Sequence, residues 1–263
     1  HPDINYIILV PEQFTMQTQK ELVLRHPRHG IMNIDVLSFA RLAFRVLEET
    51  GNGSREILDD EGKNLILRRL AGKKEDSLKV LKGNIKKPGY ISEVKSVISE
   101  LTQYNISPDG MDAMITEADE SSYLAWKLKD IQVMYQAFEE YLADKYITKE
   151  EILDILCNVM DKSRMLKDSV IALDGFTGFT PLQNKVLGEM LHHCQKVMIT
   201  VTMDKREDPY VMKDKYQLFA LSKQMVTSLV KIAGEEKVLV EEPVCLYQEP
   251  VWRFRNAPAL AFL

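Results

Sequence analysis

An aspartate closes the apolar run of residues 169–173, at a position that carries chemistry in nucleotide-hydrolysing proteins. In those proteins such an aspartate (the Walker B motif) holds the water shell of a magnesium ion, and a glutamate after it orients the attacking water. Here Asp174 is followed by Gly175, so that base is missing. The sequence also lacks a phosphate-binding loop of the form G-x-x-x-x-G-K-[ST]. Asp174 and Gly175 are therefore either a degenerate Walker B motif or a turn that ends a strand.

Polar side chains follow a second apolar run, residues 5–10. Gln13 and Thr15 offer neutral donors and acceptors for phosphates or base edges. Loops at the carboxyl ends of parallel strands face the ligand crevice of an open α/β sheet. Both residues are therefore candidates for binding.

Aromatic side chains and an arginine follow a third apolar run, residues 34–37. Phe39 and Phe44 can stack on a base, and Arg41 can pair with a phosphate or a guanine edge. Core packing is the more common role of aromatic residues on a helix. Phe176, in a glycine-containing loop after a strand, is harder to assign to a core, because loops run over the surface. All three loops are expected to open on one edge of a parallel sheet, which predicts a binding crevice.

The pattern of apolar runs predicts an α/β fold with a parallel sheet. Short apolar runs indicate buried strands at residues 5–10, 34–37, 169–173, 196–202 and near 238–240. Helices are predicted between them, at residues 16–25, 39–49, 181–192 and 216–232.

The middle third of the chain, from about residue 58 to residue 164, is predicted to be all-helical. Its helices are expected at residues 61–70, 91–101, 108–117, 121–144 and 150–160. Thr148 and Glu151 have the spacing of a capping box for the last of them. The simplest architecture is a parallel α/β core that a helical insertion interrupts between its second and third strands.

Composition describes an ordinary globular protein, with 263 residues and a net charge of −5 from 34 basic and 39 acidic side chains. That charge argues against wholesale wrapping by nucleic acid, although it leaves room for a narrow site. No apolar run approaches the roughly 20 residues of a transmembrane helix, so we expect no membrane partner. Three widely spaced cysteines argue against a disulfide framework or a structural zinc site and favour the cytoplasm.

The sequence begins at His1 rather than Met, and its last residues resemble the start of an apolar helix. We expect it to be a piece of a longer polypeptide, whose other motifs lie elsewhere.

Four motifs in chain order resemble those of a known family: VPEQFT, DVLSFARLAFRVLEETG, SREILDDEGKNLILRRL and ALDGFTGFTPLQNKVLGEML. They resemble the AddB family, the second subunits of the bacterial ATP-dependent helicase/deoxyribonuclease AddAB, over essentially the whole chain. The resemblance implies a RecA-like parallel sheet of the P-loop NTPase or superfamily 1 helicase domain 1A type, with an inserted all-helical domain 1B. Domain 1A would consist of residues 1–57 and 166–263, and domain 1B of residues 58–165.

The same resemblance implies a function in DNA double-strand break repair by recombination. The complete subunit would form a cytoplasmic heterodimer with the AddA subunit on single- and double-stranded DNA, as a 5′–3′ exonuclease that uses ATP, Mg²⁺ and a 4Fe–4S cluster. The phosphate loop and the nuclease domain would lie outside this sequence, and none of its cysteines matches the cluster motif. This region would be inactive as a motor, with no catalytic residue, metal or cofactor. Its role would be to bind single-stranded DNA and help recognise the hotspot sequence Chi.

By resemblance, the recognition residues are Gln13, Thr15, Phe39, Arg41, Phe44 and Phe176, which all follow predicted strands. The family carries Trp where this chain has Phe44, so the stacking face remains and the indole donor is lost. Two alternatives stay open: a nucleotide-binding ATPase domain whose phosphate loop lies outside the sequence, and a scaffold for subunit interaction.

Overall fold

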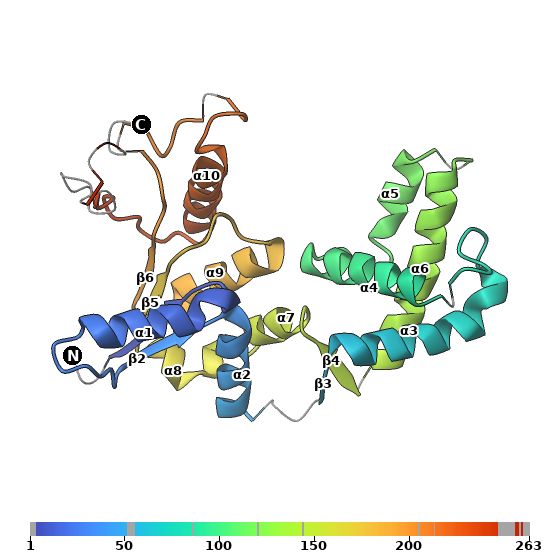
Figure 1. The fold of residues 1–263 in the computed structure, drawn as a ribbon, viewed down its shortest axis with the longest axis horizontal. Helices are drawn as coiled ribbons and strands as arrows, with labels where there is room; N and C mark the ends of the chain where they lie inside the picture. The colour runs from blue at the N-terminus through green and yellow to red at the C-terminus, as the bar shows by residue number, and fades with distance from the viewer. Residues whose placement is uncertain are drawn as a thin grey trace.

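The computed structural model describes residues 4–51, 56–85, 87–119, 121–143, 145–204, 206–212, 214–246, 256–257 and 259. They form two lobes with separate hydrophobic cores (Figure 1). The sheet lobe holds a parallel β-sheet and its covering helices, and the helical lobe consists of α3 to α6. No helix in these described ranges is long and apolar enough to cross a membrane.

The sheet of the sheet lobe has four parallel strands in the order β2-β1-β5-β6 within the described residues. Their bounds are β1 (Asn5–Leu9), β2 (Ile34–Leu37), β5 (Ser169–Leu173) and β6 (Lys196–Ile199). The expected α/β fold with a parallel sheet is thereby confirmed. Each of these strands lies in a predicted apolar run, and β6 ends three residues before the predicted limit.

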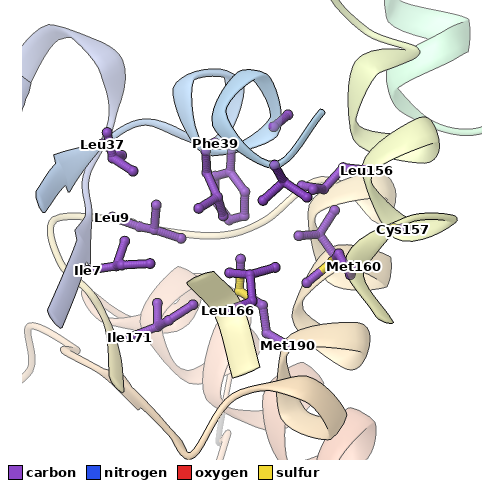
Figure 2. Packing of buried hydrophobic residues seen from close by; sticks show 14 of the residues in the cluster. Ile7, Leu9, Leu37, Phe39, Leu156, Cys157, Met160, Leu166, Ile171 and Met190 are labelled. Carbon is purple, nitrogen blue, oxygen red and sulfur yellow. The ribbon is translucent and has the colours of Figure 1, made fainter. Parts of the chain in front are cut away.

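One face of the sheet carries the core of this lobe. Ile7 and Leu9 of β1 and Ile171 and Leu173 of β5 alternate along their strands and point to the same face, as Figure 2 shows for Ile7, Leu9 and Ile171. Helices pack on this face: α2 (Phe39–Glu49), α7 (Ile152–Cys157), α8 (Arg164–Lys167) and α9 (Pro181–His193). Buried aliphatic side chains from the strands and these helices fill the space between them.

The opposite face of the sheet is only partly covered. Tyr6 and Ile8 of β1 are half-buried there. Helix α1 (Thr15–Arg25) packs along β2, but only Thr15 among its residues is buried. The two faces of the sheet therefore differ in how completely they are packed.

The helical lobe has its own apolar core, formed by side chains such as Leu67, Ile98, Met134 and Phe138. Its helices are α3 (Asp60–Lys74), α4 (Pro88–Gln103), α5 (Met111–Glu117) and α6 (Tyr123–Leu142). Short 3₁₀ segments occur in both lobes, at Glu12–Phe14, Glu75–Ser77 and Met160–Lys162. Helix α6 lies within the predicted helix of residues 121–144, which has the strongest apolar repeat of the sequence. Apolar residues at steps of three and four along one segment identify an amphipathic helix without any information on the elements that pack against it.

The prediction that residues 58–164 are all-helical is wrong at residues 146–148 and at its first residue. Strands β3 (Glu56–Leu58) and β4 (Tyr146–Thr148) form a parallel pair where the chain enters and leaves the helical lobe (Figure 1). Each has three residues, too few for an alternating pattern to stand out. Thr148 and Glu151 do exchange hydrogen bonds, with the Glu151 Oε2 accepting from the Thr148 amide at 2.8 Å, but α7 begins only at Ile152.

The predicted strand near residues 238–240 is also wrong. This stretch follows α10 (Ala220–Glu235), pairs with no strand in the described residues, and leaves Leu239 almost fully exposed. A short apolar run forms a strand only where the edge of a neighbouring strand is available to hydrogen-bond its backbone N–H and C=O groups.

Candidate DNA-binding cleft

The carboxyl ends of β2, β1 and β5 lie side by side. Leu9 of β1 is in register with Leu37 of β2 on one side and with Leu173 of β5 on the other. The three loops that follow therefore leave the sheet at a common edge, as the sequence predicts for parallel neighbours.

Three phenylalanines form a ring cluster: Phe39 at the start of α2, and Phe176 and Phe179 in the loop after β5. The ring centroids of Phe39 and Phe176 are 5.6 Å apart at an interplanar angle of 69°, and those of Phe176 and Phe179 are 5.1 Å apart. Edge-to-face and tilted contacts at these distances are favourable for aromatic rings. Phe39 is 6% exposed, and Figure 2 shows its ring pointing from α2 into the aliphatic core. Phe176 and Phe179 are half-buried and pack against that core.

A cleft of about 400 Å³ lies at this edge, between the sheet lobe and the helical lobe. Its sheet-lobe wall includes Phe39, Phe176 and Gln183, and its opposite wall includes Asp60 at the start of α3 and Gln103 at the end of α4. Among the described residues, the lining consists of Val10, Pro11, Glu12, Ser38, Phe39, Ala40, Asp60, Gln103, Lys149, Glu150, Ile152, Leu153, Phe176, Thr180, Leu182 and Gln183. Aromatic faces and uncharged polar groups thus share one cleft.

Acidic groups in the lining shape the electrostatics of the cleft. Glu150 pairs with the buried Lys63 at 2.5 Å, and Asp60 pairs with Lys95 at 3.3 Å. Burial by itself raises the pKa of Asp60, but the hydrogen bond from Lys95 and the charges of Lys95 and Lys63 outweigh it, so this pKa lies below its ordinary value. Asp60 is therefore ionised at neutral pH.

Asp174 and Gly175 lie beside the ring cluster and have structural roles. The Asp174 Oδ1 accepts a hydrogen bond from Thr200 Oγ1 at 2.5 Å, which ties the end of β5 to the residue after β6. Gly175 has φ +78°, a left-handed conformation that strains any residue with a Cβ. The missing glutamate after Asp174 thus coincides with a backbone position that favours glycine.

The family model described as "ADDB, N-terminal" matches residues 1–263, the whole chain. The chain belongs to this AddB family.

Relatives of this AddB-family chain are named as subunits of an ATP-dependent helicase/deoxyribonuclease. One from Lachnoclostridium phytofermentans is 46% identical over 100% of this chain and 23% of its own length. Others from Clostridium kluyveri and Ruminiclostridium cellulolyticum are 34% and 30% identical, over 99% and 98% of this chain and 22% of their own lengths. The chain therefore spans about a fifth of the length of these relatives.

The predicted residues of the first loop have different surroundings in this AddB-family chain. Gln13 is exposed and is not part of the cleft lining. Thr15 is buried, and its hydroxyl donates a hydrogen bond to the Glu12 carbonyl at 3.0 Å, so it helps to begin α1. Glu12, which sequence reasoning passed over, lies in the cleft instead.

Helix α2 separates the predicted residues of the second loop. Phe39 faces the core and the cleft, whereas Arg41 and Phe44 lie on the exposed surface of α2 and are not part of the lining. Leu42 and Ala43, which lie between Arg41 and Phe44 in the chain, share the core face of α2 and are fully buried. Arg41 makes no side-chain hydrogen bond or ion pair with any described residue.

Sequence reasoning also missed Gln183, although a signal for it exists. Thr180-Pro181-Leu182-Gln183 has the T-x-x-Q spacing of a capping box, and the structure contains both of its hydrogen bonds. For Asp60, Gln103 and Lys149 no such signal exists, because Asp60 and Gln103 approach the cleft from helices of the other lobe and Lys149 from the turn between β4 and α7.

The cysteines do not fit an iron–sulfur cluster, which takes four thiolates where the chain has three cysteines. Burial raises the pKa of Cys157 and of Cys194 to about 11, so both are protonated thiols at neutral pH. In the part of the chain that the structure describes, no three His, Cys, Asp or Glu side chains are grouped so that they could hold a metal ion.

Proposed function

We propose that this chain is the N-terminal helicase-like region of an ATP-dependent helicase/deoxyribonuclease subunit and that its cleft binds single-stranded DNA. The observation that carries the proposal is the pair Phe39 and Phe176, which line a cleft at the carboxyl edge of a parallel sheet. The names of the relatives support DNA as the ligand.

The charges of the cleft favour bases over phosphates inside it. Among the described lining residues, three carboxylates, from Glu12, Asp60 and Glu150, stand against a single lysine, Lys149. Because Asp60 and Glu150 are already paired with Lys95 and Lys63, the lining offers phosphates little positive charge, whereas uncharged bases can stack on aromatic rings there. Arg41, on the exposed surface of α2, supplies a cation for the DNA backbone outside the cleft.

The proposal includes the finer assignments that the family resemblance implies. In it, the sheet lobe is domain 1A of a P-loop NTPase-type fold and the helical lobe is the inserted domain 1B, which the separate cores support. Because Ile152, Leu156 and Met160 pack in the sheet-lobe core, the proposal ends domain 1B before α7 rather than at residue 165. The region works without motor activity, in agreement with Gly175 and with the bond that ties Asp174 to Thr200. It pairs with a motor subunit of the AddA type in the cytoplasm and holds the unwound strand during Chi recognition.

Replacing Phe176 with Ala in the full-length subunit, assembled with its partner, tests the proposal. Stacking on an aromatic side chain contributes about 1–3 kcal/mol per base, so we expect affinity for single-stranded DNA to fall about five- to 150-fold. Chi-dependent product fragments should disappear while unwinding continues.

Phe179→Ala is the matched control for Phe176→Ala. Phe179 belongs to the same ring cluster but not to the cleft lining, so its loss weakens packing without removing a cleft face. Unchanged DNA affinity and an unchanged Chi response in Phe176→Ala would rule the proposal out. Robust DNA-stimulated ATP hydrolysis by the full-length subunit alone would favour the ATPase alternative, and photocrosslinks from single-stranded DNA that avoid both lobes would favour the scaffold.

A further inference from the structure

The side chain of Gln183 is held in one orientation by the capping box of α9. The Thr180 Oγ1 accepts a hydrogen bond from the backbone N–H of Gln183 at 3.3 Å, and the Gln183 side-chain Oε1 accepts one from the backbone N–H of Thr180 at 2.9 Å. A backbone N–H can only donate, so the end of the side-chain amide that faces Thr180 must be its oxygen. The NH₂ group of Gln183 is therefore the end that remains for other contacts.

That NH₂ group has no hydrogen-bond partner in the described part of the chain. Gln183 is half-buried and lines the cleft together with Thr180, Phe39 and Phe176. Glutamate serves equally well at the third position of a capping box, because the cap needs only an acceptor. The glutamine in this place adds two N–H donors to the cleft that the cap does not use.

We propose that Gln183 is a specificity-determining residue whose NH₂ group donates a hydrogen bond to a base stacked on Phe176. This inference rests on the proposed function, because it needs a base in the cleft. The bond from Thr180 holds the oxygen toward the helix cap, so the side chain presents its donor to the cleft, whereas the two-bond contact of glutamine with adenine uses both a donor and an acceptor. A donor aimed at this ring position favours thymine O4 over the amino group that cytosine carries there, and guanine O6 over the amino group of adenine.

Gln183→Glu removes the proposed hydrogen bond to the base but keeps the cap of helix α9. The carboxylate still accepts from the Thr180 amide, so α9 keeps its cap, but the donor becomes an acceptor. The measurement is binding of the full-length subunit to oligo(dT) and to oligo(dC), which place the same base in the cleft in every register. Contacts elsewhere cancel when the dT/dC affinity ratio of the variant is compared with that of the wild type.

We expect Gln183→Glu to lower the dT/dC affinity ratio by about fivefold or more, since a favourable hydrogen bond to O4 becomes a contact between two acceptors. Gln103→Glu is the control, because it adds the same charge to the opposite wall of the same cleft. It should weaken both oligonucleotides alike and leave their ratio unchanged.

An unchanged ratio in Gln183→Glu, with the melting temperature of the wild type, overturns the inference. The result for Phe176→Ala shows whether the role of Gln183 or the binding of bases in the cleft has failed. If Phe176→Ala weakens binding while Gln183→Glu leaves the ratio unchanged, only the role of Gln183 is wrong. If Phe176→Ala binds both oligonucleotides as the wild type does, no base stacks in the cleft and the proposed function fails first.

Discussion

Phe39 and Phe176 are neighbours in the ring cluster, yet a substitution of Phe39 mainly tests the stability of the fold, whereas one of Phe176 mainly tests ligand contact. Phe39 is almost completely buried in the sheet-lobe core, so its removal would create a cavity that costs about 3–5 kcal/mol of stability. Phe176 is half-buried and comes from a loop, so its loss affects the fold less. Core packing and ligand contact are thus combined in Phe39, and Phe176 is the informative position for mutagenesis.

Phe44 illustrates how the helical period decides which aromatic reaches the cleft. It is 39% exposed and lies on the surface of α2 that also carries Arg41, whereas Phe39 lies on the buried face. Any base that stacks on Phe44 must therefore lie outside the cleft, on the same exposed surface of α2 as the Arg41 guanidinium.

Arg41→Ala should weaken binding to single-stranded DNA with little change in the stability of the fold. An exposed arginine that pairs with no described residue changes the stability by at most about 0.5 kcal/mol. Each phosphate contact on single-stranded DNA adds about 0.7 to the slope of log affinity against log salt concentration, so the variant should lose about that much slope. Titration of the full-length subunit with DNA at several salt concentrations measures this slope.

Arg45→Ala provides the control on the same helix. Arg45 is also exposed, but its guanidinium pairs with Asp35 at 2.5 Å and is less available to a phosphate. A salt slope that falls equally in both variants would contradict a specific role for Arg41.

At the scale of elements, Asp130 joins helix α6 to the segment between α3 and α4. Its carboxylate is 2% exposed and accepts hydrogen bonds from three consecutive backbone amides, those of Lys79, Val80 and Leu81, at 2.7–3.1 Å. These donors belong to no helix or strand, so the carboxylate takes the place of the missing secondary-structure partners.

Asp130→Ala should destabilise the helical lobe by about 2 kcal/mol or more, because it leaves the buried N–H of Leu81 and the partly buried N–H groups of Lys79 and Val80 without their acceptor, at about 1–3 kcal/mol for a fully buried group. Urea unfolding followed by circular dichroism measures the effect. Asp130→Asn retains one oxygen of the same shape and should lose less. Equal losses in the two variants would show that side-chain volume, rather than the hydrogen bonds, is what matters.

At the scale of the whole molecule, the buried ion pair of Lys63 and Glu150 links α3 to the segment between β4 and α7, where the two lobes meet. Lys63 of α3 is 2% exposed, and its Nζ contacts Glu150, which lies between β4 and α7, at 2.5 Å and Ser99 of α4 at 3.3 Å. Glu150 lines the cleft, so this pair holds one wall of the candidate site against the helical lobe.

Lys63→Met should cost about 3–5 kcal/mol of stability, because it leaves a largely buried carboxylate without its partner. The double variant Lys63→Met with Glu150→Gln removes the uncompensated charge and should recover much of that loss. Unfolding free energies of the wild type, both single variants and the double variant form a thermodynamic cycle. Strict additivity in this cycle would mean that the two side chains do not interact in solution.

The sequence by itself determined the elements whose signals are local. Strands β2 and β5 and helix α2 have the predicted bounds, because an apolar run bounded by turn residues and a cap such as Ser38 act within a few residues. The meeting of three loops at one edge also followed from sequence, since parallel strands place all their carboxyl ends on the same side.

Only the tertiary structure decided what depends on residues far apart in the chain. Strand β3 forms because β4, about 90 residues later, pairs with it, and the stretch near residues 238–240 remains irregular because no described strand does the same for it. The opposite wall of the cleft, with Asp60 and Gln103, likewise exists only when the helical lobe packs beside the sheet lobe. Local patterns record which face of an element is apolar, but not which partner covers it, because burial is set by the sum of distant contacts.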